Sequence, residues 1–197
     1  MARARLLARG SSPGKHCPRF RHYSLGTSWA TVDYMAGDRA FLVASIDAIL
    51  IAESAVESQL IADDQLGSVA QLIVDAYAGI HGETKTLDEA TTMVADIIGG
   101  SMGEPRRDAW LGVWEGYGLP VSAILCTTWR GMPFIAHVLT APAARGRGYA
   151  SSLVREAAVV FAGSGATHFG VALDRDSAFA DLFRELGFVE MFSAVQA

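Results

Sequence analysis

Three apolar, strand-like runs follow one another at residues 109–118, 119–129 and 132–140, separated only by short glycine-containing turns. Turns as short as these join neighbouring antiparallel strands. A chain with this feature has to build a sheet, and the flanking elements decide what covers that sheet. We therefore predict three antiparallel strands in the middle of the domain.

Two amphipathic helices are predicted before these strands. The first follows Asp63 and Asp64, which can cap it, and its apolar residues recur every three or four positions, as in a helix with one buried face: Leu66, Val69, Ala70, Ile73 and Tyr77. The second starts after Thr86, because Glu89 three residues later completes a capping box, and it ends at the glycine pair 99–100.

A helix, a strand, another helix and a last strand are predicted after residue 140. The first of these helices has one apolar face, formed by Leu153, Val154, Ala157, Ala158 and Phe161. A strand at 168–173 follows. The next helix is capped by Asp176 or Ser177, ends at Gly187, and turns these side chains inward: Phe179, Leu182, Phe183 and Leu186. With strands at 55–61 and 189–195, the order is β-α-α-β-β-β-α-β-α-β, an α/β fold with a mixed sheet flanked by helices.

The N-terminal part differs from the rest in charge. Its first 30 residues hold six of the 16 basic residues and no acid, so we expect a disordered basic tail to about residue 37, with a mitochondrial transit peptide as the alternative. Residues 38–53 are predicted to form a helix. Residues 1–52 are thus expected to be an N-terminal extension, and residues 53–197 the folded domain.

Bulk composition argues against several classes of protein. Beyond residue 30 the chain holds 10 basic and all 21 acidic residues, a net charge of −11, which makes it a poor general binder of nucleic acid. The longest apolar run, 40–52, contains Asp47 and is shorter than the roughly 20 residues that cross a membrane. Two cysteines, Cys17 and Cys126, form no disulfide framework, so a cytoplasmic protein is expected, with Cys126 in the core.

The connection at residues 140–154, with the sequence TAPAARGRGYASSLV, is the strongest candidate for a binding site. A helix leaves its first backbone N–H groups unpaired, and its N-terminus carries about half a positive charge. Gly146 and Gly148 have no Cβ atoms to keep a phosphate away from these donors, and Arg145 and Arg147 add charge. The loop therefore predicts a pyrophosphate site made mostly of main chain.

The same loop could also be a plain surface connector, since turns rich in glycine and arginine are common on protein surfaces. A Walker A loop is excluded, because no Lys followed by Ser or Thr comes after the last glycine. The dinucleotide fingerprint fails at Ser151 and would have to stand at the start of a βαβ unit, not after antiparallel hairpins. A pyrophosphate site and a surface connector thus remain as the two main roles for this loop, with dinucleotide binding as a third.

The sequence resembles the GNAT family of acyl-CoA-dependent N-acyltransferases. Arg145, Gly148 and Ala150 match the family's loop signature, and Pro142 stands where the family often has proline. Residues 182–188, LFRELGF, look like the closing helix of the family, and the order of elements agrees. The resemblance covers residues 53–195.

The resemblance implies how a donor and an acceptor would bind. Acetyl-CoA would be the acyl donor, without a metal, and its pantetheine arm would bond to the strand edge at Val138, Leu139 and Thr140. Its pyrophosphate would lie, with Arg145 alongside, on Gly146, Arg147, Gly148, Tyr149, Ala150 and Ser151, and two family positions near the cofactor are here Asp176 and Phe183. The thioester would sit near Ala136 and Val138. An amine would approach from the side of the two early helices, near Tyr77, Ile80 and His81.

The usual proton-transfer residues of the family are absent. Phe183 replaces its tyrosine and Asp176 its asparagine, and Val171, Ala136 and Phe134 stand where relatives place Glu or His. The remaining candidates for catalysis are Glu115, Tyr117 and His137, with His81 and Glu83 as further options, and ordinary structural roles compete with each of them. Strand alternation places His137 on the opposite side of the sheet from Ala136, unless a bulge intervenes.

The sequence thus predicts a cytoplasmic N-acetyltransferase that transfers an acyl group to an amine of a small molecule or peptide. The aromatic residues Trp110, Trp114, Tyr117, Trp129 and Phe134 are either core residues or the wall of a pocket for a partly apolar amine. The alternative is a non-catalytic acyl-CoA-binding sensor or scaffold, and a nucleic-acid-binding module using the basic tail is the third possibility. No nucleic acid or membrane partner is expected, and a homodimer is compatible with the sequence.

Overall fold

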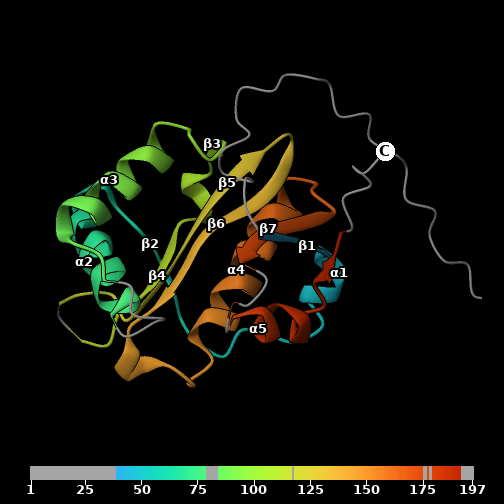
Figure 1. The fold of residues 1–197 in the computed structure, drawn as a ribbon. Helices are drawn as coiled ribbons and strands as arrows, with labels where there is room; N and C mark the ends of the chain where they lie inside the picture. The colour runs from blue at the N-terminus through green and yellow to red at the C-terminus, as the bar shows by residue number, and fades with distance from the viewer. Residues whose placement is uncertain (1–38, 79–83, 117, 175–176, 178, 192–197) are drawn as a thin grey trace, which may run out of the picture.

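The structure is a computed structural model that describes residues 39–78, 84–116, 118–174, 177 and 179–191 (Figure 1). Within these residues the strands form one eight-stranded sheet, in the order β2-β4-β5-β6-β7-β1-β8, with β3 paired to β5. The strands are β1 (Arg39–Ser45), β2 (Gln59–Leu60), β3 (Glu104–Pro105), β4 (Leu111–Val113), β5 (Ser122–Trp129), β6 (Met132–Thr140), β7 (His168–Asp174) and β8 (Val189–Glu190).

Helices cover both faces of the sheet and enclose a hydrophobic core on each (Figure 1). The helix α2 (Leu66–Tyr77) and the helix α3 (Leu87–Ile98) pack on one face, over β5 and β6. The opposite face carries α1 (Ile46–Ile49), α4 (Tyr149–Gly163) and α5 (Ala180–Glu185). All paired strands are antiparallel except β6 and β7, which run parallel. The predicted α/β class with a mixed sheet is confirmed.

Residues 38–53 differ most from the prediction. The expected helix is the strand β1 followed by the four-residue helix α1. β1 pairs with β7 over its whole length and with β8 on its other edge, so it is an interior strand of the sheet and not part of an extension that ends at residue 52. A short apolar run fits a buried strand and a buried helix equally well, and only the distant partner β7 decides between them.

The two early helices form where they were predicted. The capping box is confirmed: Thr86 Oγ1 accepts the Glu89 N–H at 3.2 Å, and Glu89 Oε2 accepts the Thr86 N–H at 2.7 Å. Asp63 and Asp64 do not cap α2. They lie in a 3₁₀ turn before it, where the Gln65 side chain instead accepts the N–H of Ala62 at 2.9 Å.

The central strands and the C-terminal elements also follow the predicted order. Arg130 and Gly131 both have positive φ angles, 51° and 80°, as a two-residue type I′ turn between β5 and β6 requires. Gly187 has a φ of 86° just after α5, as predicted for its C′ position. Phe179, predicted to point inward, is 39% exposed, because α5 starts only at Ala180.

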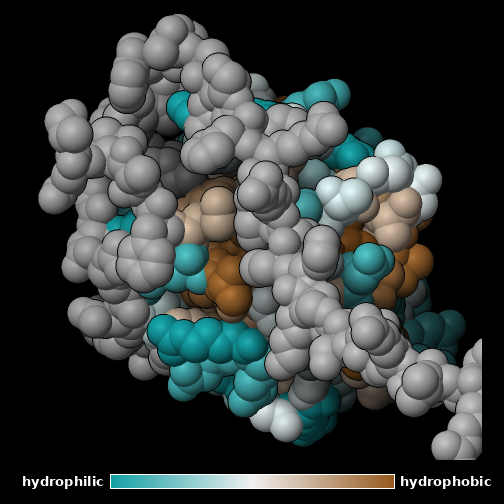
Figure 2. All heavy atoms as spheres, turned by 90° about the vertical axis from the view of Figure 1, so that its right-hand side faces the viewer, coloured by the Kyte–Doolittle hydropathy of each residue, from teal (hydrophilic) through white to brown (hydrophobic). Residues whose placement is uncertain are grey.

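The edge strand β8 consists of Val189 and Glu190, the first two residues of the predicted strand 189–195, and residues 192–195 of that prediction lie outside the described residues. Val189 is 60% exposed and Met191 44%. Hydrophobic surface is visible between hydrophilic side chains on the side that Figure 2 faces. No helix in the described part of the chain has both the length and the apolar character to cross a bilayer.

Candidate active site

The strand β6 is paired very differently on its two edges. It pairs with β5 from Met132 to Thr140, but with β7 only at Phe134–Gly170 and Ile135–Val171. Residues 136–140 of β6 and 172–174 of β7 then run on without pairing each other. We call this gap in the ladder the β6–β7 opening. Val138, Leu139 and Thr140, the residues predicted to bind a pantetheine arm, lie along it.

A β-bulge in β6 stands at the start of the opening. Leu125 of β5 pairs with His137, and the next residue, Cys126, pairs with Ile135, so Ala136 is the extra residue. Directly paired residues share a face, and Leu125 and Ala136 both belong to the core under α2 and α3. His137 therefore faces the same side as Ala136, because the bulge that the sequence left open does occur and reverses the placement expected from strict alternation.

His137 is held as a neutral imidazole. Burial is the main cause that lowers its pKa to about 4 from an ordinary value of 6.5, and the positive charge of Arg39 acts in the same direction. At neutral pH its ring therefore has one nitrogen without a proton, which can accept one. This candidate lies at the opening and on the side of the two early helices.

The loop after β6 leads into the N-terminus of α4. Gly146 and Gly148 have φ angles of 74° and 80°, so their backbone is in the left-handed region that favours glycine. A Cβ atom would meet nothing within 4 Å at Gly146, and only Ser151 Oγ at 3.8 Å at Gly148. Because Ser152 N–H bonds to Gly148 O, the first helical N–H groups of the 15-residue helix, from Tyr149 to Ser151, have no acceptor within the helix.

Arg145 has a structural role that the sequence did not suggest. Its Nη2 donates to the carbonyl oxygen of Ala76 at 2.7 Å, and its Nε donates to that of Thr140 at 3.4 Å. The guanidinium thus joins the C-terminal end of α2, where a positive charge is favourable, to the end of β6. These contacts place the last turn of α2 beside the β6–β7 opening.

Glu115 is engaged with the loop. One of its oxygens, Oε1, accepts a hydrogen bond from Arg147 Nη1 at 2.9 Å and another from the Tyr149 hydroxyl. The Tyr149 bond is the main cause that lowers the pKa of Glu115, and the charge of Arg147 adds to it. Glu115 is therefore ionised and ties the β4–β5 connection to the loop, which makes it a weaker candidate for a general base.

Other predicted site residues are not brought to the opening. Phe183 is completely buried in the core under α4 and α5, with its ring edge-on to Phe188 at 5.2 Å, so nothing can bind to it without rearrangement. Of the predicted aromatic pocket, Trp110 and Trp114 pack in the core under α2 and α3, apart from Trp129 and Phe134, which contact Phe41. Several candidates lie outside the described residues, namely Ile80, His81, Glu83, Tyr117 and Asp176.

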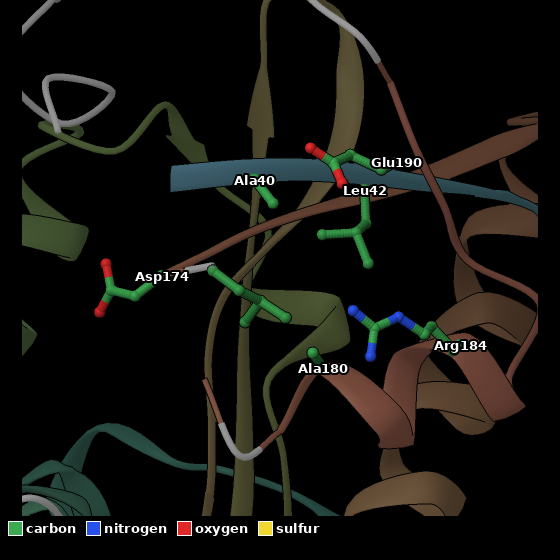
Figure 3. A pocket seen from close by; sticks show the side chains of 7 residues that line it. Ala40, Leu42, Asp174, Ala180, Arg184 and Glu190 are labelled. Carbon is green, nitrogen blue, oxygen red and sulfur yellow. The ribbon is translucent and has the colours of Figure 1, made fainter. Parts of the chain in front are cut away.

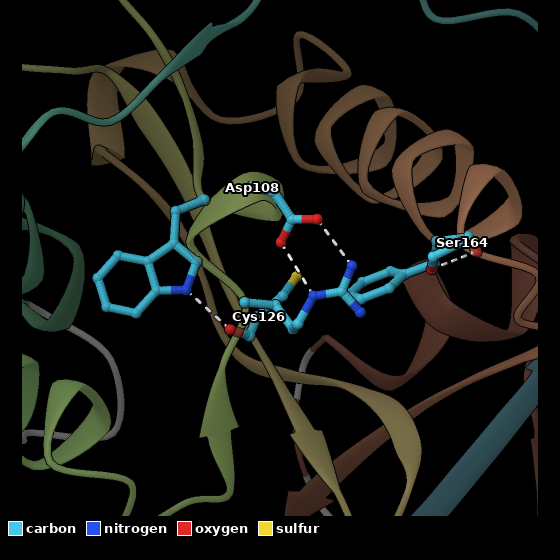
Figure 4. A network of polar contacts seen from close by, with 6 residues as sticks. Asp108, Cys126 and Ser164 are labelled. Carbon is cyan, nitrogen blue, oxygen red and sulfur yellow. Dashed lines mark hydrogen bonds and ion pairs between the residues drawn. The ribbon is translucent and has the colours of Figure 1, made fainter.

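Cys126 is a core residue, as predicted. Its carbonyl oxygen accepts the indole N–H of Trp110 at 2.7 Å, and burial raises the pKa of its thiol (Figure 4). Nearby, Arg106 makes two hydrogen bonds to Asp108, at 2.9 and 2.7 Å, and its guanidinium carbon lies 4.7 Å from the centre of the Phe161 ring. This network attaches α4 to the sheet and leaves no thiolate for catalysis.

A pocket of about 220 Å³ lies between α5 and the strands β1, β7 and β8 (Figure 3). It is separate from the glycine loop, and its lining residues are Ala40, Leu42, Leu173, Asp174, Ala180, Arg184 and Glu190. Arg184 points into it, whereas the carboxylate of Asp174 points away (Figure 3). Among the described residues no group of three His, Cys, Asp or Glu side chains could hold a metal ion.

Comparisons with known proteins agree with this architecture. Residues 115–196 match the family model of the FR47-like proteins, whereas no curated protein matches the chain. A GCN5-related N-acetyltransferase from Sphaerobacter thermophilus is 17% identical, with a TM-score of 0.56 over 78% of this chain and 48% of that one. A GNAT-family acetyltransferase from Colwellia psychrerythraea is 17% identical, with a TM-score of 0.57 over 81% and 58% of the two chains.

A third structure is matched over nearly the whole of its own length. The GCN5-related N-acetyltransferase from Ralstonia eutropha is 15% identical, with a TM-score of 0.50 over 72% of this chain and 97% of that one. By contrast, this chain spans about half of the Sphaerobacter protein. The fold is that of the GCN5-related N-acetyltransferases, and the resemblance found in the sequence is confirmed.

Proposed function

We propose that this chain is an acetyl-CoA-dependent N-acetyltransferase that acts on an amine of a small molecule or peptide. One observation carries the proposal: the parallel pair β6–β7 comes apart after Ile135 and Val171, and β6 then leads into a glycine loop at the start of α4. The opening offers unpaired strand edge to a ligand, and the loop offers unpaired N–H groups to an anion. The N-acetyltransferase fold supports the same conclusion.

The loop residues fit the pyrophosphate of a CoA thioester. The positions beside Gly146 and Gly148 are open, the N–H groups from Tyr149 to Ser151 start a long helix, and Arg147 adds a charge. Arg145 acts by holding the end of α2 in place. We infer that backbone groups at Val138 and Thr140, in the part of β6 that β7 leaves unpaired, bond the amides of the pantetheine arm, which would carry the thioester to the bulge at Ala136.

The acceptor amine approaches from the α2 and α3 side. Its nitrogen attacks the thioester carbonyl carbon, the carbon–sulfur bond breaks, and the proton lost by the amine ends on the thiol of CoA. Attack makes the amine nitrogen strongly acidic, so even a weakly basic imidazole can take its proton. His137 lies on this side and is neutral, and we assign it that role.

The departing sulfur needs little help from an acid, because a thiol has a pKa of about 8.5 and its thiolate leaves readily. Phe183 replaces the acid common in the family and is buried, so protonation by α5 is not part of this mechanism. Positioning of the two reactants supplies most of the rate, since well-oriented groups gain several kcal/mol over free ones.

Calorimetric titration with acetyl-CoA, followed by thiol release with a panel of amines, tests the proposal. Binding with release for one class of amines is the expected result. Binding without release for any amine would favour an acyl-CoA-binding sensor or scaffold. No binding at all would mean that the glycine loop has been misinterpreted.

A further inference from the structure

Three aromatic side chains from different strands meet beside the bulge, and the proposed mechanism does not use them. Phe41 of β1, Trp129 of β5 and Phe134 of β6 have their ring centres 5.9 to 6.0 Å apart. The rings of Phe41 and Phe134 are nearly parallel, with 10° between their planes. The core under α2 and α3 and the core under α4 and α5 contain none of the three. We call these residues the aromatic cluster.

Strand alternation places the aromatic cluster on the face from which the acceptor amine would approach. Ile135 belongs to the core under α4 and α5, so its neighbour Phe134 points to the opposite side, the α2 and α3 side. In β1, residues 40 and 42 belong to the core under α4 and α5, so Phe41 between them also points to the α2 and α3 side.

The strand ladders place Phe41 level with the position proposed for the thioester. Phe134 pairs with Gly170 in the parallel β6–β7 ladder. Two residues further along β7, Ala172 pairs with Phe41 of β1. Two residues further along β6 stands Ala136, the extra residue of the bulge. Phe41 and Ala136 are thus on one level of the sheet, with only the strand β7 between them.

The strand β7 carries small residues where it passes between Phe41 and β6. A Cβ atom at Gly170 would lie 2.8 Å from Met132 Cε and 3.4 Å from Phe41 Cζ, so the Phe41 ring leans over the β7 backbone there. Ala172, next on the same face, has only a methyl group and is partly exposed. No side chain of β7 at these two positions is therefore large enough to separate the thioester position from the Phe41 ring.

The helices on this face leave part of the aromatic cluster accessible. α2 and α3 pack over β5 and β6, and in Figure 1 they lie toward the β4 side of the sheet, away from β1. Phe134 is 1% exposed, whereas Phe41 and Trp129 are both partly exposed. Apolar side chains gathered on one stretch of surface mark interaction sites, whereas exposed ones scattered singly do not. A ligand at the bulge can therefore contact the cluster.

We propose that the aromatic cluster binds an aromatic group of the acceptor, so that the enzyme acts on amines joined to an aromatic ring by a short arm. This inference rests on the proposed acetyltransferase function and names the acceptor class for it. Neighbouring strands are about 5 Å apart, so the backbone of Phe41 is about 10 Å from β6, and its ring covers part of that distance. An acceptor ring stacked on Phe41 leaves its amine close to Ala136. Offset stacks and edge-to-face pairs of rings are favourable beyond the area that they bury.

Packing of β1 against the β5–β6 hairpin is the alternative role of the aromatic cluster. If the cluster only packs, loss of one ring lowers the stability and changes the turnover of all amines alike. If it binds the acceptor, loss of a ring changes only those amines that carry an aromatic or other large apolar group. A comparison of matched amines therefore separates the two roles.

The test measures kcat and KM by thiol release for three primary amines: phenethylamine, cyclohexylethylamine and methoxyethylamine. The first two are similar in size, and the third has no ring. The wild type should prefer phenethylamine over methoxyethylamine by about tenfold or more in kcat/KM, because burial of a ring contributes at least this factor, with cyclohexylethylamine between them. Phe41→Ala should raise KM for phenethylamine by about tenfold, with kcat retained and methoxyethylamine changed less than about twofold.

Two further variants complete the design, and thermal unfolding checks that each variant is folded. Phe41→Leu keeps an apolar side chain but no ring, so it should turn over phenethylamine and cyclohexylethylamine equally well. Phe179→Ala is the matched control, because it removes a ring that is 39% exposed at the start of α5, on the other face of the sheet. It should leave the preference unchanged.

The outcomes distinguish this inference from the proposed function. Equal kcat/KM of the wild type for the three amines, or an equal effect of Phe41→Ala on all of them, would overturn the inference and leave the acetyltransferase intact. If acetyl-CoA binds and no amine releases thiol, the proposed function fails and this inference fails with it.

Discussion

The two edges of β6 differ in how completely they are paired, and the difference bears on where a ligand could bind. On the β5 side the pairing is continuous from a tight turn at Arg130 and Gly131, and on the β7 side it stops after two pairs. The first edge needs only local sequence, because a hairpin closes a short loop. The second edge joins residues far apart in the chain, and its incompleteness leaves backbone groups for a ligand. The strand β6 is thus fully paired on its β5 edge and only partly paired on its β7 edge.

The largest expected effect concerns the hydrophobic core under α4 and α5, which contains Phe183. Phe183→Ala should lower the free energy of unfolding by about 3–5 kcal/mol, because it leaves a cavity in a fully buried site. Phe183→Tyr restores the family's residue, but its hydroxyl would be buried and should not raise kcat. Urea unfolding and thiol-release kinetics check both variants, and a faster Phe183→Tyr enzyme would show that α5 opens to the substrate.

The second prediction concerns the anion site at the end of the open edge. Gly148→Val should weaken acetyl-CoA binding by about 100-fold or more, because the side chain takes the place of the pyrophosphate and the bonds to two or more N–H groups are lost.

Gly165→Val is the matched control. Gly165 has a φ of 81°, nearly the same as the 80° of Gly148, and open space around it, but it follows the other end of α4. Both variants should lose about 1–3 kcal/mol of stability from backbone strain. Only Gly148→Val should lose affinity in calorimetry, and equal affinities for the two variants would refute the placement of the pyrophosphate.

The third prediction concerns the proton acceptor at the bulge. His137→Gln should reduce kcat by about 10- to 100-fold with little change in the affinity for acetyl-CoA, at the lower end of what general bases contribute, because the imidazole is weakly basic. Single-turnover kinetics measure the chemical step. An unchanged rate would remove His137 from the mechanism.

The same residue predicts a pH dependence of stability. The pKa of His137 is lowered to about 4 in the folded state from 6.5, so below 6.5 the unfolded chain binds a proton that the folded protein does not. The free energy of unfolding should therefore fall as the pH drops from 6.5 to 4. His137→Gln should make the urea midpoint less dependent on pH over this range, and an identical slope in the variant would contradict the lowered pKa of His137.

The smallest effect is expected at the tie between the loop and the β4–β5 connection. Glu115→Gln removes the negative charge to which both Arg147 and Tyr149 donate hydrogen bonds, and it should reduce kcat by less than about tenfold. Loss of a general base, by contrast, lowers the rate by about 10²–10⁴-fold. Steady-state kinetics decide between the two roles. A loss within the larger range would reinstate Glu115 as the base.

Local signals account for the parts of the fold that were predicted. The capping box of Thr86 and Glu89, the turn at Arg130 and Gly131, and the C′ position of Gly187 each depend on neighbouring residues and on backbone preferences that the residue type determines. The glycine loop belongs to the same class, and so its position before α4 was also foreseen.

Contacts between distant residues account for what was missed. β1 is a strand because β7 and β8 lie beside it, the bulge at Ala136 depends on the pairing with Leu125, and Arg145 meets Ala76 only in the folded chain. Once residues 38–53 were taken for a helix, Phe41 could not be placed beside Phe134. The parts of the candidate site that depend on neighbouring residues are therefore predictable from the sequence, whereas contacts between residues of different strands and helices are not.

Hydrogen exchange with and without acetyl-CoA tests the central claim most directly. Our account predicts slower exchange in two segments, the β6 edge at residues 138–140 and the loop and first helical turn at residues 146–151, with little change along β5. Binding accompanied by protection elsewhere, and none in these two segments, would contradict it.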